Sequence, residues 1–443
     1  MMMLRLVLFL CTVGIASSAG AQHDARPGVE RLTLEDALAR GLATSQRLAE
    51  LQAREEGAGA AVAGRRAAAR PLVTLMGGYT RTNHVEEFGI AIPGLPPRVI
   101  YPDIPDNFRS RLDLQWPVYT GGRLGALEHA ARAERAAAGE ELVAARADLR
   151  LEITRAFWAL VTARETETVV ARSLDGMDAH VGELRSRLEQ GLIPPSDVLS
   201  AEAQHSRARL LAIEARNTRA TADADLHRLI GIEGDGAIEP LAILESEPVA
   251  SGAPTVLVEN ARNGRPERRA LEQRADASTA RATAVAASAR PQVAAVGGYD
   301  YGRPNLRLFP RTARWRESWD VSLNFTWLVW DGGRRRAELS EALAGARGAQ
   351  ARIAEFDRQA AFEVRQRWLE LDSSRAAIEA SDHGLRSATE ARRVILERFN
   401  AGVAMSTDVV DAEIAVLQAA LDRTRALATA RVSDARLQRA LGR

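Results

Sequence analysis

The 443-residue sequence contains no lysine, so arginine supplies all 59 of its basic side chains. Because 58 acidic residues balance them, the formal net charge is only +1. The chain therefore lacks the strongly basic character of nucleic-acid-binding proteins, and no nucleic-acid partner is expected. Aromatic residues are also scarce, at 5%. With few large side chains for a core, the composition favours alanine-rich helices packed closely side by side.

Cysteine and long apolar runs are nearly absent as well. The one cysteine, Cys11, lies in an apolar run from Leu6 to Ile15, with Arg5 before it and small residues after it. This pattern is typical of a cleaved secretory signal, here residues 1–21. The mature chain would then have no disulfide and no lipid attached through cysteine. Beyond residue 21 no stretch approaches the ~20 apolar residues of a membrane-spanning helix, so membrane insertion would require β-strands.

What the sequence does contain is an internal repeat. Residues 191–202 read GLIPPSDVLSAE and residues 402–413 read GVAMSTDVVDAE, a shift of 211. In each copy a glycine ends one helical pattern, and Ser or Thr followed by Asp begins the next. Both copies are predicted to be turns between two helices. We divide the chain into a first repeat (22–231), a connector (232–254) and a second repeat (255–443).

Each repeat also contains two predicted strands. The first strands follow Arg70-Pro71 and Arg290-Pro291, and both contain Gly-Gly-Tyr, with Tyr79 and Tyr299 shifted by 220. A loop of about two dozen residues, rich in glycine and proline, follows the first of them, and its counterpart is shorter. In the second strands, 108–116 and 319–327, oily and aromatic side chains alternate with polar ones. This alternation is typical of a barrel wall between lipid and water.

Glycine pairs at 121–122 and 332–333 then allow a sharp turn from strand to helix. The helical patterns that follow, 123–190 and 334–401, would each be about 100 Å long. Four strands cannot close a barrel in lipid, because open edges are not tolerated and small barrels need ~8 strands. At least two chains must therefore combine their strands and helices around a water-filled cylinder.

The duplicated arrangement, the Leu-x-Leu-x-x-Ala opening at Leu32, the Gly-Gly-Arg corners and the Gly-x-x-x-x-[Ser/Thr]-Asp-Val turns together resemble the TolC-like outer-membrane efflux proteins. The resemblance extends from about Leu32 to Gly442. It implies a mainly α fold with a membrane β-barrel. A homotrimer would form a long α-helical barrel in the periplasm below a 12-stranded β-barrel, with four strands per protomer.

The resemblance also implies a function. The protein would be the outer-membrane exit duct of a tripartite efflux or secretion system, a passive channel gated at the periplasmic helix tips. Its partners would be a periplasmic adaptor protein, an inner-membrane transporter and outer-membrane lipid, with no cofactor. A non-channel periplasmic helical scaffold is the alternative. The cargo is not indicated by the sequence.

The family's functional positions fall at the two turns. Asp408 and Asp411 match acidic rings at the pore constriction, where threefold copies would favour cations. Ala404 stands where the best-known member has a latch arginine. A second interpretation stays open, in which Asp197 and Asp408 are helix caps after Ser196 and Thr407. The predicted periplasmic tip and adaptor contact consists of Gly191, Leu192, Ser196, Asp197, Gly402, Val403 and Thr407.

Other candidate sites have simpler explanations. The seven histidines are scattered without metal-ligand spacing and are expected on helix surfaces. No nucleophile and base pair or phosphate loop is apparent, so an enzyme is not expected. Trp327 and Trp330 are interpreted as part of an interfacial aromatic belt. The run Arg334-Arg335-Arg336 is interpreted as the membrane–water boundary.

Overall fold

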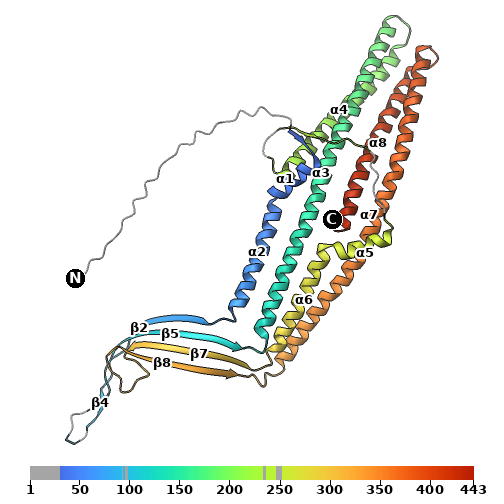
Figure 1. Cartoon of the computed structure of the whole chain (residues 1–443). Coiled ribbons are helices and arrows are strands. Elements are labelled where there is room, and N and C mark those ends of the chain that lie inside the picture. The colour runs from blue at the N-terminus through green and yellow to red at the C-terminus, as the bar shows by residue number, and fades with distance from the viewer. Residues whose placement is uncertain (1–29, 92, 95–97, 233–235, 246–251) are drawn as a thin grey trace, which may run out of the picture.

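The computed structural model describes residues 30–91, 93–94, 98–232, 236–245 and 252–443. The expected signal, residues 1–21, lies outside these ranges, as do 233–235 and 246–251 of the connector. Figure 1 shows a sheet at one end of the molecule and long helices running away from it. Among the helices described, none has both the length and the apolar character needed to span a membrane.

The two repeats have the same order of main elements. Helices α1 and α5 have the same length, 11 residues, and α2 and α6 both have 22. Each pair of helices is followed by two long strands, a 67-residue helix and a shorter returning helix. The first repeat comprises β1 (Glu30–Leu32), α1 (Leu34–Thr44), α2 (Gln46–Ala67), β2 (Leu72–Arg81), β3 (Phe88–Ile90), β4 (Arg98–Tyr101), β5 (Asp106–Tyr119), α3 (Arg123–Glu189) and α4 (Pro195–Ile230). After β6 (Ile238–Pro240), the second comprises α5 (Pro254–Gly264), α6 (Pro266–Ala287), β7 (Gln292–Arg303), β8 (Arg316–Thr326), α7 (Arg334–Asn400) and α8 (Ser406–Ala440).

The four long strands form one antiparallel sheet in the order β2-β5-β7-β8. The two repeats meet where β5 pairs with β7, with Asp113 opposite Gly298. One face of the sheet carries large exposed apolar side chains, among them Val321, Trp319 and Leu75. The predicted strands and their alternation are confirmed. The edges of the sheet, β2 and β8, have no further strand beside them among the described residues.

The glycine corners are confirmed as turns from sheet to helix. Gly122 and Gly333, with a φ of 92° in both, precede α3 and α7, a backbone conformation that favours glycine. At the first corner, the Arg290 guanidinium donates to the Gly121 carbonyl oxygen over 2.9 Å. A Cβ on Gly121 would lie 2.9 Å from the Ala287 carbonyl oxygen. The corner of the first repeat is therefore packed tightly against the end of α6.

Helix α3 lies at the centre of the helical part. It packs against α2 and α6 near the sheet and against α4 and α8 further away, whereas α7 packs against α6, α5 and α8. The predicted apolar face of α3 is buried and includes Ile153, Phe157 and Leu160. On α7, Val364 and Leu371 are buried as predicted, but Trp368 is half-buried. The α2 and α4 side and the α7 side are the lateral edges of this helical layer.

Two pairs of short strands were not predicted. β1 and β6 pair in parallel, with Leu32 opposite Pro240, which joins the connector to the start of the first repeat. β3 and β4 form a hairpin inside the long loop that was expected to be irregular. The β-branched and aromatic run Val99-Ile100-Tyr101 suits a strand, and it is too short to stand out in a loop rich in glycine and proline.

Candidate functional site

The two hairpin ends, which we call the first tip (α3–α4 turn) and the second tip (α7–α8 turn), have the same backbone. Gly191 and Gly402 have φ values of 73° and 75°. The next N–H groups, of Leu192 and Val403, donate to carbonyl oxygens five residues earlier, each over 2.9 Å. This is the glycine-terminated helix end known as the Schellman motif. The predicted turns are therefore confirmed in both repeats.

Leu192 and Val403 are exposed at these tips. Their exposed fractions are 67% and 64%, although a residue at this place commonly packs back on the helix it follows. Figure 1 shows both tips at the end of the molecule furthest from the sheet. Each hairpin therefore presents an apolar side chain at its extremity that the protomer itself does not cover.

The helices after the turns begin three residues earlier than they would if Asp197 and Asp408 were the N-caps. The residues before the first helical turn are Pro194 and Met405, so Asp197 and Asp408 lie at the third helical position. The Met405 N–H donates to the Asp408 carboxylate over 2.9 Å, which stabilises the start of α8 from within its first turn. Asp197 instead accepts from the Ser196 hydroxyl over 3.3 Å.

Asp411 lies one turn further along α8 and is exposed. Val409 and Val410 are buried against the neighbouring hairpin, so Asp411 and exposed Thr407, four residues apart, lie on the opposite side of the helix. Among the residues described, the Asp411 carboxylate has no hydrogen-bond or ion-pair partner. The structure thus brings Thr407, Asp408 and Asp411 together on one side of the second tip, with Thr407 and Asp411 exposed and Asp408 half-buried.

Behind the tips, the two hairpins pack together around a small apolar core. Buried residues from all four helices meet there, and the Arg187 guanidinium lies 4.3 Å from the centre of the Phe399 ring. The core consists of Met177, Val181, Leu184, Val198, Ala201, Phe399, Val409 and Val410. The first and second tips are therefore held to each other within one protomer.

A buried histidine joins the same contact. His180 is 6% exposed, its Nε2 lies 3.1 Å from the Ser406 hydroxyl, and its ring packs edge-on against Phe399. Burial lowers the pKa of His180, opposed by the carboxylates of Glu183 and Glu413. The expectation of a surface position is wrong for this histidine. The residues around His180 mix apolar and charged types and do not indicate that it is buried. Its partner, Ser406, is 226 residues away in the sequence.

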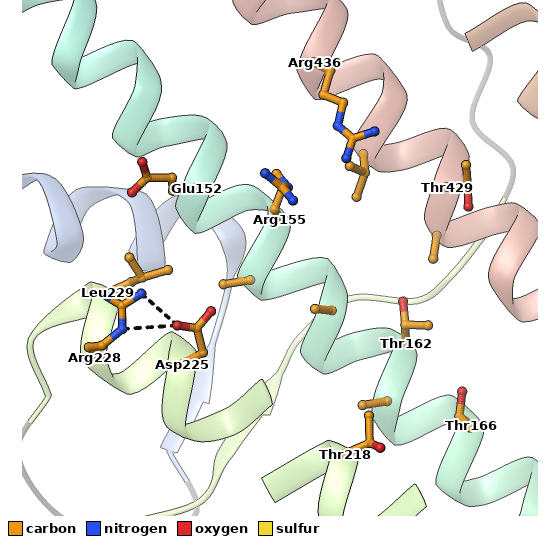
Figure 2. Close-up of a pocket in the computed structure, with 15 residues that line it drawn as sticks. Glu152, Arg155, Thr162, Thr166, Thr218, Asp225, Arg228, Leu229, Thr429 and Arg436 are labelled. Carbon is orange, nitrogen blue, oxygen red and sulfur yellow. Dashed lines mark hydrogen bonds and ion pairs between the residues drawn. The ribbon is translucent and has the colours of Figure 1, made fainter. Parts of the chain in front are cut away.

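An open groove of about 680 Å³ lies between α3, α4 and α8. Figure 2 shows α3 running between the other two helices, with Asp225 and Arg228 paired. Arg155, Thr162 and Thr166 line the groove from α3. They lie on the opposite side of this helix from Ile153 and Phe157, which pack in the core with Leu32 and Ile238. One face of the helical wall is thus covered by the short elements, and the other is open and polar.

The polar face of the sheet carries an ion-pair network. Asp300, which is 4% exposed, accepts from Arg109 at 2.6 Å and from Arg111 at 3.3 Å. Arg111 also pairs with Asp113 and Asp320. These charges lie on the side of the strands opposite the exposed apolar side chains. The sheet therefore has one face suited to lipid and one suited to water.

A four-stranded sheet with a lipid-type face, above two long helical hairpins that end in glycine turns, is the architecture of a TolC-like channel-tunnel protomer. The family model described as outer membrane efflux protein matches residues 37–232 and 257–443. The chain belongs to this family, and the family and fold are those of channel proteins.

Individual proteins agree with the family match. Protein CyaE of Bordetella pertussis is 27% identical over 337 residues, which cover 71% of this chain and 68% of CyaE. The crystal structure of CusC matches with a TM-score of 0.78 at 17% identity, over 92% of each chain. The outer membrane protein VceC of Vibrio cholerae matches with a TM-score of 0.75 at 22% identity, over 92% of this chain and 96% of VceC. The predicted fold resemblance is confirmed.

Proposed function

We propose that three copies of this chain form a channel-tunnel that crosses the outer membrane and serves as the exit duct of an efflux or secretion system. Each copy would contribute four strands to one barrel and four long helices to one periplasmic tunnel. The observation that carries the proposal is that the sheet and the helical layer end in open edges on the same two sides of the protomer. Such edges are not tolerated in lipid unless another copy covers them.

The repeat predicts how the copies meet. Within one protomer, the second strand of the first repeat (β5) pairs with the first strand of the second repeat (β7). Continuing this order around a ring places β8 of one copy beside β2 of the next. The shifts of 211 and 220 residues convert the Asp113–Gly298 pair into Asn324 of one copy opposite Gly78 of the next. Within one protomer α3 packs against α6 and α8. The same repeat shift places α7 of one copy beside α2 and α4 of the next.

Exposed apolar side chains support these helix contacts. Phe362 and Leu369 of α7 are 68% and 59% exposed, and Leu199 and Leu210 of α4 are 64% and 56% exposed. These four residues lie on the two lateral edges of the helical layer, where the protomer provides no cover. Burial of such side chains on assembly would contribute about 25 cal/mol per Å² of apolar surface.

We further propose that Asp408 and Asp411 form the pore constriction and that Gly191, Leu192, Ser196, Asp197, Gly402, Val403 and Thr407 form the tip that meets a periplasmic adaptor. The position of Thr407, Asp408 and Asp411 on one side of the second tip supports the first role. Exposed Leu192 and Val403 support the second.

Asp411→Ala should reduce block by divalent cations in planar bilayers, and unchanged block would remove Asp411 from the constriction. Leu192→Asp combined with Val403→Asp should uncouple the adaptor while trimers persist.

The trimer is tested by disulfide formation across the predicted seam. Cys11 lies in the predicted signal, so Gly78→Cys with Asn324→Cys would supply the reacting thiols. The space around a Gly78 Cβ is open, and directly paired strand residues have Cα separations that a disulfide can bridge. Oxidation should give covalent trimers on denaturing gels. The matched control, Met76→Cys with Asn324→Cys, is displaced by two residues on the same strand face and should give none.

Two outcomes contradict the proposal. Recovery of a folded, soluble periplasmic monomer would favour the scaffold interpretation, because its open edges would then need no second copy. Efficient cross-linking of the displaced pair instead of the predicted pair would show that the repeat does not set the seam.

A further inference from the structure

The open groove between α3, α4 and α8 combines apolar and polar lining. Its volume of about 680 Å³ lies within the range of about 300–1,000 Å³ that is usual for small-molecule sites. Small apolar side chains line it, among them Ala159, Ala428 and Val432. Hydroxyl groups reach it from all three helices, namely those of Thr162, Thr166, Thr218 and Thr429. The groove therefore suits a ligand that has both an apolar body and a polar group.

Arg155 brings an uncompensated positive charge to this groove. Its side chain is exposed and has no hydrogen-bond or ion-pair partner in the ranges that the structure describes. Two acids line the same groove, and both are engaged. Glu152 pairs with Arg47 over 2.9 Å, and Asp225 pairs with Arg228 over 2.8 Å (Figure 2). An anionic group that enters the groove would therefore meet an arginine whose donors are unused.

A second arginine, Arg436 of α8, lines the groove together with Arg155 of α3 (Figure 2). Arg436 lies 4.0 Å from the Glu370 carboxylate. Arg367 holds the same carboxylate oxygen at 2.9 Å. Because one glutamate faces two arginines, positive charge is in excess on the α8 side of the groove as well.

The groove would face the water path of the proposed tunnel. The other side of α3 is covered by short elements, whose Leu32 and Ile238 belong to the core, and such elements would fill a tunnel if they lay inside it. Thr429 of the groove is 18 residues from Asp411, which is five helical turns, so both lie on one side of α8. At ~1.5 Å per residue the groove is about 27 Å above the proposed constriction.

The next copy in the ring would not neutralise Arg155. The groove is formed by helices of one protomer, and the neighbour's α7 would lie beyond α4. The repeat equivalents of Arg155 and Ala159 on α7 are Gln366 and Glu370. Glu370 already faces two arginines of its own copy, Arg367 and Arg436. Three Arg155 side chains, one from each copy, would therefore remain available to solutes in the tunnel.

We propose that this groove binds organic anions that carry a carboxylate or sulfonate on an apolar body. The inference rests on the proposed channel and adds to it a binding site for one chemical class of cargo. Arg155 would hold the anionic group through the parallel N–H donors of its guanidinium. The threonine hydroxyls would complete the hydrogen bonds, and the alanine and valine side chains would contact the apolar body. Three such sites would raise the local concentration of these anions in the tunnel.

The test uses a reporter thiol in full-length protein in detergent. Thr429→Cys places an exposed thiol in the groove, and its rate of reaction with a neutral methanethiosulfonate is measured as naphthalenesulfonate is added. We expect the probe to slow the reaction. Arg155→Gln should raise the half-protecting concentration at least about fivefold, because a charge-assisted hydrogen bond is lost.

Matched controls separate the site from general effects of charge and of the probe. Arg150→Gln removes an exposed arginine of α3 that does not line the groove, and it should leave the half-protecting concentration unchanged. Thr168→Cys, an exposed position of α3 outside the groove, should not be protected. Uncharged naphthalenemethanol should protect Thr429→Cys at least about fivefold less well than the sulfonate.

Four results would overturn the anion site: no protection of Thr429→Cys, equal protection by the uncharged probe, an unchanged half-protecting concentration in Arg155→Gln, or equal protection by inorganic sulfate. The last result would indicate a site for small inorganic anions instead. Conductance in planar bilayers, measured on the same preparations, separates the two proposals. Conducting trimers without protection would contradict the groove alone, whereas protection without conducting trimers would contradict the channel.

Discussion

Helices α3 and α7 occupy the same place in the two repeats and have the same length, yet their surroundings differ. Of their 67 residues each, α3 buries 21 and α7 buries seven. Trp158 of α3 and Leu369 of α7 are equivalent positions in the repeat. Trp158 is 8% exposed, whereas Leu369 is 59% exposed. Because α3 is central and α7 is at an edge, the comparison shows which contacts one protomer completes and which it leaves for a second copy.

The largest difference between α3 and α7 is expected when a large side chain is removed from the core of α3. Phe157 is fully buried, so Phe157→Ala should lower the free energy of unfolding by about 3–5 kcal/mol. Trp368, at the same repeat position on α7, is half-buried, and Trp368→Ala should cost less in the dissociated protomer. Urea unfolding followed by circular dichroism measures both. Equal losses would show that the two helices are equally central.

Placing a charge on the exposed surface of α7 should affect assembly and not folding. Leu369→Asp leaves the carboxylate in water in the single protomer but buries it against the next copy in a trimer, a cost that pairing does not offset. We expect the trimer fraction to fall by at least about tenfold in light scattering, with unchanged helical content. Leu369→Met, which keeps an apolar side chain of similar volume, should assemble normally. Full assembly of the Asp variant would place this surface outside the interface.

Loss of the contact between the tips should cost less than loss of the Phe157 ring from the core of α3. Ser406→Ala removes the hydroxyl beside buried His180, which should cost about 1–3 kcal/mol because the ring nitrogen loses its partner. The first repeat has Pro195 at this position and nothing comparable to lose. Hydrogen exchange in the first turns of α8 should therefore accelerate, whereas exchange in α4 should change little. Equal acceleration in both helices would contradict the difference.

The same histidine makes the contact pH-dependent. Burial lowers the pKa of His180 in the folded state, so the neutral ring is favoured there. Its contribution to stability is complete above the unfolded value of about 6.5 and is lost as the pH falls from there through the lower folded pKa. Protection of the start of α8 should decrease over this acidic range. His180→Gln should flatten the pH profile, and an unchanged profile would assign the effect to another group.

The smallest expected difference concerns the helix starts. Asp408 accepts from the Met405 N–H, and Asp408→Ala should destabilise the start of α8 by about 0.5–1 kcal/mol. Within the described part of the chain, Asp197 accepts only from the Ser196 hydroxyl, so Asp197→Ala should have a smaller effect on α4. Thermal unfolding of wild type and of each variant measures the two losses of stability. A larger effect from Asp197 would mean that the stiffer Pro194-Pro195 turn depends on its acid.

Local patterns predicted most of the fold, because alternation, glycine pairs and helix-ending turns depend on neighbouring residues. The sheet, the corners at Gly122 and Gly333 and the turns at Gly191 and Gly402 follow from them. The β1–β6 pair and the burial of His180 do not, since both depend on partners roughly two hundred residues away. The sequence predicts later helix starts because Ser196 and Thr407 resemble N-caps. Pro195 instead has the fixed φ that suits the first helical position.

The packed corner at Gly121 has a counterpart that the protomer leaves empty. Among the residues that the structure describes, no atom other than those of Gly332 and its chain neighbours lies within 4 Å of a Cβ placed on Gly332, although Gly332 is the repeat equivalent of Gly121. The equivalent of Arg290, which closes the first corner, is exposed Arg70 at the opposite edge. In a ring, Arg70 of each copy would reach the Gly332 carbonyl of its neighbour. Six equivalent arginine–carbonyl contacts would then encircle the channel where sheet meets helix, three within copies and three between them.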